Sequence, residues 1–505
     1  MARVAAMPFF VLLMGVGALA MMVPALHALA LGDYRTSRIF LYGAILSGML
    51  TVLIGLATRS HVPRSVARSQ LMSLAAAFGL LPVMLAAPFF EAAQLRNYLH
   101  AWFEMVSSFT TTGATLYDSV WRLNPSLHLW RALVGWLGGF LIWVTAISIL
   151  APMNLGGFEV RSSAAAGAGV RSLGQTARIA DPTERLARYS LKLAPIYCGL
   201  TFLLWIGLIL AGDSAFVAIC HAMSTLSTSG ISPLSGMHAA PSGFAGEAII
   251  FVFLFFALSR LTFSRGLASD ERNRIWRDPE FGLALVILAT VPTLLFLRHF
   301  LAAAENDVVS GLADAIRAFW GGLFTVLSFL TTTGFESREW MGMSDFSRLE
   351  TPGLILVGLA LIGGGVATTA GGVKLLRVYA LARHGQRELE RLVHPDSVGG
   401  SGAEARRIRR QGAYVAWIFF MLYALSIVAV MLLLSLTGVQ FENAMVLAVA
   451  ALSTTGPLAQ VAAESPVLYS GIPDAAKAIL ALTMVLGRLE LLAIIALLNP
   501  EFWRD

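Results

Sequence analysis

One short phrase occurs four times in this sequence, each time as a run of hydroxyl-bearing residues that ends in glycine. The copies end at glycines spaced 117, 104 and 122 residues apart, and they read Ser107-Ser-Phe-Thr-Thr-Thr-Gly113, Ser224-Thr-Leu-Ser-Thr-Ser-Gly230, Ser328-Phe-Leu-Thr-Thr-Thr-Gly334 and Ala450-Ala-Leu-Ser-Thr-Thr-Gly456. A period this long is unlike the 20 to 50 residues of a solenoid. It predicts four copies of a larger subdomain.

The composition places these subdomains in a membrane. Of the 505 residues, 57% are hydrophobic and 13% are charged, whereas an ordinary soluble domain has about 25% charged residues. Mean hydropathy is +0.73, so most apolar side chains must face lipid. This excludes a soluble enzyme and predicts an all-α polytopic membrane protein.

The four phrases have the same surroundings. Each follows a long apolar segment, a polar break and a short apolar stretch, and each precedes another apolar segment. The short stretches are residues 98–110, 213–227, 314–331 and 441–453. Most are too short to cross a hydrocarbon core of about 30 Å. They predict re-entrant half-helices, each followed by a loop that is buried in protein or lines a water-filled cavity.

The repeats divide the chain into five parts. Residues 1–60 predict a transmembrane hairpin, since the apolar run 7–31 is longer than a signal-peptide core of about 7 to 15 residues. The remaining parts are pore repeat one (61–160), pore repeat two (161–275), pore repeat three with a glycine-rich gate loop (276–385) and pore repeat four (386–505). We expect about ten crossings and four half-helices around one pseudo-fourfold pore.

The basic residues indicate orientation. They crowd four connections and are sparser in the alternate ones, which the positive-inside rule explains. The basic connections are residues 59–68, 161–192, 260–277 and 374–410. We therefore place these connections and both termini in the cytoplasm. The stretch 377–410 is either an ordinary basic loop or a contact for a regulatory partner.

The sequence gives little support to nucleic-acid binding, metal binding or catalysis. The net charge of +6 is spread between apolar segments, which is unlike a nucleic-acid-binding face. Two cysteines and nine histidines show no metal-binding spacing. A polytopic membrane enzyme is the alternative from another class, but the sequence shows no paired acid and base for it.

The four loops suit a cation. Four half-helices aim their C-terminal ends at one point, and each end carries about half a negative charge. Loop carbonyls can replace the hydration shell of the ion, while glycine permits positive φ. Hydroxyl groups can brace the loops from behind. The predicted filter residues are Thr111, Thr112, Gly113, Thr228, Ser229, Gly230, Thr332, Thr333, Gly334, Thr454, Thr455 and Gly456.

These loops resemble the Trk/Ktr/HKT superfamily of potassium transporters, particularly the TrkH membrane subunits of bacterial Trk systems. Further matching residues are Phe103-Glu104, Gly456-Pro457, Gly487-Arg-Leu-Glu490 and Pro500-Glu-Phe-Trp503. The resemblance implies one asymmetric pore, a homodimer in the bacterial inner membrane and a cytosolic TrkA-like ring of nucleotide-binding regulatory subunits. It also implies K+ as the transported ion, with no organic cofactor in this chain.

Ion preference rests on the first glycine. In the family, serine at that position accompanies sodium permeation, and Gly113 therefore favours potassium. Ser229 and the Ser453-Thr-Thr-Gly456 loop depart from the family pattern. A sodium-permeable or ion-coupled transporter of the same fold stays open as the alternative.

A glycine-rich run predicts a gate. Residues 363–372 contain five glycines, and each costs a helix about 1 kcal/mol relative to alanine. In the family, the matching segment is an intramembrane loop that obstructs the pore below the filter. The bland alternative is close helix packing through small residues. The predicted gate residues are Gly363, Gly364, Gly365, Gly371, Gly372, Lys374 and Arg488.

Two further sets of polar residues lie in or beside apolar segments. Arg488 lies in the last apolar segment, where a charge is expensive and usually faces a cavity or a partner. The family match places it opposite the gate loop, and a structural arginine is the alternative. We expect four residues in or beside the half-helices to act as caps rather than as ion contacts. These are Glu104, His221, Asp314 and Glu442.

Overall fold

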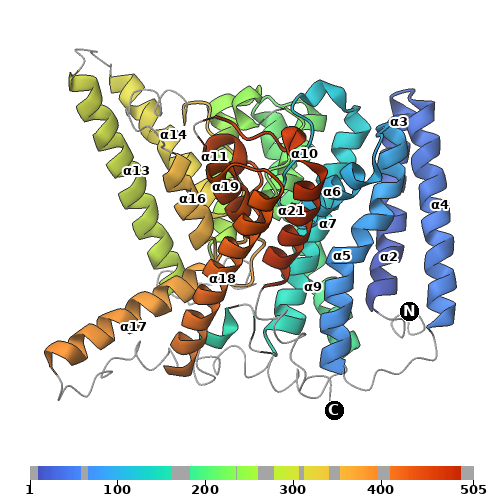
Figure 1. The fold of residues 1–505 in the computed structure, drawn as a ribbon. Coiled ribbons are helices and arrows are strands. Elements are labelled where there is room, and N and C mark those ends of the chain that lie inside the picture. Colours follow the sequence, from blue (N-terminus) through green and yellow to red (C-terminus); the bar gives the residue numbers. More distant parts are fainter. Residues whose placement is uncertain are drawn as a thin grey trace.

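The computed structural model describes residues 9–58, 66–153, 155, 157–160, 182–234, 236–259, 278–305, 312–340, 353–394, 410–463 and 465–490. Within these ranges every regular element is helical, and the helices stand side by side as in a membrane bundle (Figure 1). The predicted all-α polytopic fold is confirmed. Parts of the first two basic connections, all of the third and residues 395–409 of the fourth lie outside the described residues, as do Pro500 to Trp503. The rest of the fourth is not a loop, because Leu375–Val393 forms a helix.

The N-terminal hairpin lies at one edge of the bundle. Helices α2 (Phe9–Ala20) and α3 (Met22–Ala30) form one apolar span, and α4 (Tyr34–Ala57) returns beside it (Figure 1). The carboxylate of Asp33 caps α4 by accepting a hydrogen bond from the Thr36 N–H at 3.1 Å. Large apolar side chains such as Leu46 are exposed along α4, as expected of a helix that faces lipid.

Four helical repeats follow the hairpin. Repeat one contains α5 (Val66–Ala92), α6 (Tyr98–Phe109), η1 (Val120–Arg122) and α7 (Pro125–Thr145), and a π-helical turn, η2 (Ala146–Leu150), extends α7. After η3 (Phe158–Val160), repeat two contains α9 (Pro182–Leu210), α10 (Ala215–Ser227), η4 (Met237–Ala239), α11 (Gly243–Leu254) and η5 (Phe255–Ala257). Repeat three contains α13 (Pro279–Glu305), α14 (Leu312–Leu330), α16 (Gly353–Ile362) and α17 (Leu375–Val393). Repeat four contains α18 (Arg410–Leu436), α19 (Phe441–Leu452), α20 (Leu458–Val461), η7 (Tyr469–Gly471) and α21 (Asp474–Leu489).

Two helices of repeat three differ in length from their counterparts in the other repeats. Eight helices among the described residues are long and apolar enough to span a membrane, and α14 is one of them with 19 residues. Its extra length lies in its first turns, where Ile316 is exposed, whereas every residue from Phe324 to Leu330 is buried. By contrast, α16 has only 10 residues, because the glycine run that begins at Gly363 ends it.

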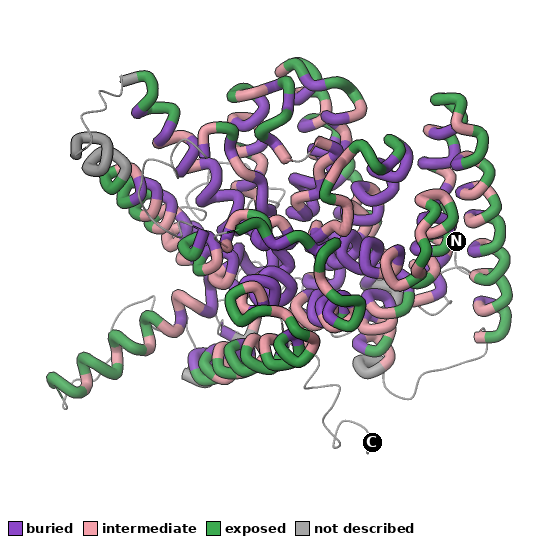
Figure 2. Tube along the Cα trace, turned by 45° about the horizontal axis from the view of Figure 1, so that its top comes forward, coloured by how far each residue is buried: buried purple, intermediate pink, exposed green. Residues whose placement is uncertain are grey.

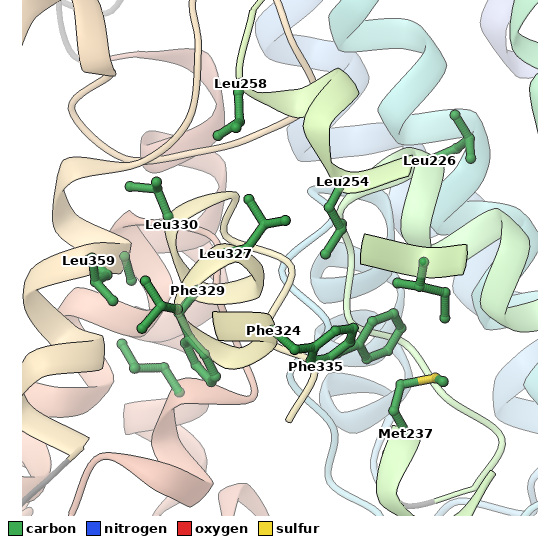
Figure 3. Packing of buried hydrophobic residues seen from close by; sticks show 14 of the residues in the cluster. Leu226, Met237, Leu254, Leu258, Phe324, Leu327, Phe329, Leu330, Phe335 and Leu359 are labelled. Carbon is green, nitrogen blue, oxygen red and sulfur yellow. The ribbon is translucent and has the colours of Figure 1, made fainter. Parts of the chain in front are cut away.

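The buried centre of the molecule is where the half-helices end. Figure 2 shows buried residues in the middle of the bundle and exposed ones along its peripheral helices. Around Phe324, Leu327, Phe329 and Leu330 of α14, the core includes Leu226 of α10, Leu254 of α11 and Leu359 of α16 (Figure 3). Side chains from repeats two and three thus form one packed unit that fixes the ends of the half-helices.

Candidate functional site

The four half-helices end in the same backbone motif. After each helix, a threonine adopts the left-handed conformation, and the next residue donates its N–H to the carbonyl five positions back. These bonds run from Thr112 to Ser107 (2.8 Å), Ser229 to Ser224 (2.9 Å), Thr333 to Ser328 (2.8 Å) and Thr455 to Ala450 (2.8 Å). This is the Schellman ending of a helix, in which the left-handed residue is usually glycine.

Threonine at the left-handed position is unusual. The φ angles are +56° at Thr111, +51° at Thr228, +58° at Thr332 and +55° at Thr454. A left-handed conformation costs an L-residue about 1–2 kcal/mol, and β-branched residues adopt it least readily. Strain of this kind collects at functional sites. A purely structural helix end has no need of it in four matched places.

Hydroxyl pairs brace the loops from behind. In each loop, the residue before the left-handed threonine contacts the residue after it through their side-chain oxygens. The pairs are Thr110 and Thr112 (2.8 Å), Ser227 and Ser229 (3.0 Å), Thr331 and Thr333 (3.1 Å), and Ser453 and Thr455 (3.2 Å). These polar groups are therefore satisfied within the protein at membrane depth.

The four loops meet in a closed ring. A Cβ atom at Gly113 would overlap the carbonyl oxygen of Ser229 in loop two. A Cβ atom at Gly230 would overlap the carbonyl oxygen of Thr333 in loop three. Gly334 lies against Pro457 of loop four, and Gly456 lies against loop one. Each glycine thus touches the next loop in order, and no side chain fits between the loops.

The fourth loop differs from the other three. Gly113, Gly230 and Gly334 have φ angles of +75°, +66° and +82°, whereas the φ of Gly456 is not positive. The N–H of Gly456 donates to the carbonyl of Thr112 in loop one at 2.6 Å. The chain then turns into α20, which repeats one to three lack after their glycines in the described part of the chain.

The glycine-rich run lies directly beneath the filter loops. The Gly371 N–H donates to the hydroxyl of the left-handed Thr332 at 2.7 Å. The Thr369 hydroxyl donates to the Leu226 carbonyl near the end of α10 at 3.2 Å. A Cβ atom at Gly371 would overlap the carbonyl oxygen of Ser453. This run, residues 363–372, therefore touches the ends of three half-helices.

The two ends of the run are joined. The N–H groups of Val373 and Lys374 donate to the carbonyls of Leu361 and Ile362 at 2.9 and 2.8 Å. A Cβ atom at Gly363 would overlap the Gly371 carbonyl oxygen, and one at Gly372 would lie 2.7 Å from the Ala360 carbonyl oxygen. The predicted break between two helices is present. Because glycine has no Cβ atom, the chain can loop out after α16 and return close to the same point before α17 begins.

The same run packs on the end of repeat two. The Gly365 N–H donates to the Ala257 carbonyl at 3.0 Å, and a Cβ atom at Gly364 would lie 2.7 Å from that same oxygen. Ala257 is the last residue of η5. The run is therefore held from the side as well as from above.

A cavity opens below the run, and its lining includes two cationic side chains, Lys374 and Arg488. The Lys374 ammonium donates to the Ala370 carbonyl within the run. Arg488 is 4% exposed, and its Nε and Nη2 atoms have no hydrogen-bond partner among the described residues. The cavity therefore holds two buried positive groups and, in Glu490, one carboxylate.

Glu490 lines the same cavity, but its ion pair is with another residue. Its carboxylate instead contacts the guanidinium of Arg377 at 2.8 Å, and that guanidinium stacks over the Phe419 ring at 3.7 Å. Glu490 lies just past the end of α21, where its φ of +61° turns the chain away from the helix that carries Arg488. Arg377 was not among the predicted gate residues, although an arginine just after a glycine break at membrane depth is a usable signal.

The outer side of loop one is held by a buried ion pair. The Nε atom of Arg131 on α7 lies 2.8 Å from the Glu104 carboxylate, with exposures of 4% and 0%. The other oxygen of Glu104 accepts a hydrogen bond from the Thr115 hydroxyl at 3.0 Å. Glu104 thus joins α6, α7 and the segment after the filter. Arg131 was missed by the sequence analysis, although an arginine inside an apolar helix is a signal.

Capping differs from the expectation. Glu104 lies within α6, and the cap is Asn97, which accepts from the Leu99 N–H at 3.0 Å. The cap of α10 is Ser214, and His221 pairs instead with the Ser232 hydroxyl at 2.8 Å. The prediction was wrong for Glu104 and His221, because both face neighbouring segments rather than free N–H groups.

Asp314 and Glu442 lie in the first turns of α14 and α19, where the helix dipole favours an acid. Neither makes a capping hydrogen bond in the described part of the chain, and Asp314 is 3.7 Å from Arg317. Their positions fit an electrostatic contribution at the helix start.

Above the filter lies an outer vestibule. Its lining includes all four filter glycines together with Asp118, Glu336 and Tyr469. Burial raises the pKa of the Glu336 carboxyl to about 7. No cluster of metal-ligating side chains occurs among the described residues.

Comparison with known proteins decides the family. Residues 36–503 match the family model TrkH, described as a cation transport protein. This chain belongs to the TrkH family. As a member it is a multi-pass membrane transporter and not an enzyme.

Named relatives agree with this family. The chain is 34% identical over 416 residues to the Trk system potassium uptake protein TrkH of Vibrio parahaemolyticus, covering 80% of this chain and 79% of the relative. It is 32% identical over 413 residues to the protein of the same name from Escherichia coli K12, with 80% and 79% covered.

A solved structure of a TrkH family member has the same fold. The crystal structure of the potassium transporter TrkH from Vibrio parahaemolyticus matches with a TM-score of 0.80 at 28% sequence identity, and it covers 100% of both chains. The bundle, the hairpin and the four pore loops of this chain therefore belong to an arrangement already found by experiment.

Proposed function

We propose that this chain takes up potassium across the bacterial cytoplasmic membrane, through a filter formed by its four loops. The single observation that carries the proposal is the set of four matched helix endings, each with a strained threonine, arranged in one ring. Similar proteins in Vibrio parahaemolyticus and Escherichia coli are called potassium uptake proteins, which supports potassium as the cargo.

Loop oxygens are the proposed ligands. The carbonyls of the left-handed threonines accept no hydrogen bond within the described ranges, and those of Gly113, Gly230 and Gly334 accept none either. The hydroxyls of Thr111 and Thr454 are buried without a partner there. Such oxygens can replace the hydration shell of a cation. The half-helix dipoles add negative potential at the same point.

The glycine-rich run is the proposed gate. It touches three of the four half-helix ends, which puts it in the path of an ion leaving the filter. The backbone N–H of Lys374 joins the two ends of the run by donating to the Ile362 carbonyl, and Arg488 adds positive charge in the cavity below. Opening requires the run to release Thr332 and Leu226.

The gate has its own experiment. Deleting residues 366–369 should raise potassium leak from loaded proteoliposomes, and Arg488→Ala should change the rate of uptake or its apparent affinity for potassium. Unchanged flux in the deletion variant would remove the gate from the mechanism. Wild-type uptake in Arg488→Ala would remove that residue alone.

The proposed assembly is a homodimer with its termini in the cytoplasm and a TrkA-like nucleotide-binding ring on that side. The names of the relatives, which refer to a Trk system, support a machine of several components. Chemical cross-linking in native membranes tests the dimer. Co-purification with a coexpressed ring protein, with and without nucleotide, tests the partner.

The filter is tested by rubidium uptake into potassium-loaded proteoliposomes. Potassium, but not sodium, should compete with rubidium, and a Gly334→Ser variant should lose uptake or selectivity. Equal competition by sodium would favour the sodium-permeable alternative. Uptake that depends on a proton or sodium gradient would favour coupled transport, and uptake indifferent to Gly334→Ser would overturn the filter.

A further inference from the structure

Tyr469 occupies a position in the filter that no sequence motif marks. It begins η7, in the segment between α20 and α21, and it is 2% exposed. Its hydroxyl donates a hydrogen bond to the carbonyl of Gly456 at 3.0 Å. Its ring packs near Phe103 of α6, with ring centroids 5.9 Å apart.

The carbonyl of Gly456 has a second partner. The Ala459 N–H donates to it at 3.2 Å as the chain enters α20. A carbonyl oxygen has two lone pairs, so both are used within the protein. The Thr455 carbonyl before it accepts from the Leu458 N–H at 3.1 Å. The Gly456 carbonyl therefore has no lone pair left for an ion, whereas the Thr455 carbonyl keeps one.

The matching carbonyls of the other loops are free. Those of Gly113, Gly230 and Gly334 accept no hydrogen bond in the described part of the chain, and all three residues line the outer vestibule. The outer end of the filter thus presents three glycine carbonyls instead of four.

The segment around Tyr469 is firmly placed. The Val467 N–H donates to the Ala459 carbonyl at 3.0 Å, and the Ser470 hydroxyl donates to Asp118 at 2.6 Å. Asp118 belongs to the segment that follows loop one. Tyr469 is therefore held between loops four and one, at the joint where the Gly456 N–H meets the Thr112 carbonyl.

We propose that Tyr469 is a positioning residue that makes the outer cation site three-sided, by holding the fourth glycine carbonyl away from the pore. This rests on the proposed filter function. Without the hydroxyl, the Gly456 carbonyl regains a free lone pair and can turn toward the ion. A mobile fourth oxygen lets the site contract around a smaller cation, so discrimination between potassium and sodium decreases.

The test measures ion binding without requiring the pore to open. Purified full-length protein is heated in potassium, rubidium, caesium or sodium chloride, with choline chloride as the reference. A bound ion raises the Tm by an amount that grows with the logarithm of its concentration relative to its Kd. Tyr469→Phe keeps the ring and removes only the hydroxyl. We expect its ratio of potassium to sodium affinity to fall about tenfold, which corresponds to about 1.4 kcal/mol.

Tyr197→Phe is the matched control. Tyr197 is also a buried tyrosine whose hydroxyl donates to a backbone carbonyl, that of Trp136, at 3.2 Å. Both variants should lower the Tm in choline similarly, and only Tyr469→Phe should change the ion ratio. An unchanged ratio in Tyr469→Phe would overturn the positioning role.

Gly334→Ser, measured beside them, separates the two proposals. Suppose that Gly334→Ser abolishes the potassium-dependent Tm shift while Tyr469→Phe leaves the ratio of potassium to sodium affinity unchanged. The proposed filter is then supported and the positioning role of Tyr469 is overturned. If Gly334→Ser keeps the full potassium shift, both proposals fall together.

Discussion

Loops one to three and loop four begin alike and end differently. All four leave their half-helix through a left-handed threonine, with φ between +51° and +58°. Beyond it, the first three continue through a glycine of positive φ, whereas loop four turns at Gly456 and Pro457 into α20. The inner part of the filter is therefore close to fourfold, and the outer part is not.

The loops are also braced by different chemistry. The serine that starts the phrase ties down the segment after the glycine in loops one and three, where Ser107 donates to the Ala114 carbonyl at 2.7 Å and Ser328 accepts from the Phe335 N–H at 2.7 Å. Loop four has Ala450 at this position, and Tyr469 supplies the outer hydrogen bond instead. A repeated sequence can thus keep one role and replace the group that performs it.

Gly113→Ala should have the largest effect on transport, because it replaces a glycine of positive φ, a feature that only the first three loops have. An L-residue at φ +75° costs about 1–2 kcal/mol, and the new Cβ overlaps the Ser229 carbonyl oxygen. We expect rubidium uptake per molecule to fall tenfold or more, because the strain and the overlap together destabilise the filter by an amount that corresponds to at least that factor.

Gly438→Ala is the control for strain alone. Gly438 has φ +92° and nothing within 4 Å of an added Cβ. Its uptake per molecule should match the wild type. Equal losses in both variants would mean that strain, and not the ring of loops, accounts for the effect.

Glu104→Gln tests the charged brace of loop one against the neutral brace of loop four. Leaving Arg131 buried without its partner should cost about 3–5 kcal/mol. Tyr469→Phe should cost only about 1 kcal/mol, as for one neutral hydrogen bond. The free energy of unfolding of each purified variant is measured by fluorescence. Equal losses in the two variants would contradict this difference in bracing.

Thr332→Val tests whether the left-handed threonine of loop three also holds the gate closed. It removes the acceptor of the Gly371 N–H, a net loss of about 1 kcal/mol, and should raise potassium leak about fivefold. The Thr454 hydroxyl has no partner among the described residues, and Thr454→Val should not raise the leak. Equal leak in both variants would show that the hydrogen bond between Gly371 and Thr332 does not hold the gate closed.

Ala450→Ser should have the smallest effect. It gives loop four the serine that starts the other three phrases, but the segment after Gly456 enters α20 and offers no matching partner. The new hydroxyl can bond within its own helix, and we expect the free energy of unfolding to change by less than about 1 kcal/mol. A marked rise in potassium affinity, measured by Tm shift, would show that loop four can adopt the geometry of the others.

The elements that the sequence predicted best are those with a local cause. Half-helices ending near Phe109, Ser227, Leu330 and Leu452 follow from short apolar stretches before hydroxyl runs. The break at Gly363 follows from glycine's cost in a helix. The bounds of α14 lie within two residues of the predicted stretch 314–331, but apolar length alone cannot separate its exposed first turns from its packed end.

The residues that the sequence missed act across long separations. Arg131 lies 27 positions from Glu104, Arg377 lies 113 positions from Glu490, and Tyr469 follows Gly456 by 13. Arg131 and Arg377 carried a signal, since charges in apolar surroundings need partners. Tyr469 carried none, because a tyrosine in a connecting segment is ordinary until its acceptor is known.

The sequence by itself determined a membrane bundle of four pore repeats with a glycine break in the third, because hydropathy, period and helix propensity are local properties of the chain. Only the tertiary structure decided that the left-handed residues are threonines, that the loops close into a ring, and that the fourth glycine carbonyl is withdrawn. Those features depend on which backbone groups meet across repeats, and that follows from packing around a shared axis rather than from any single repeat.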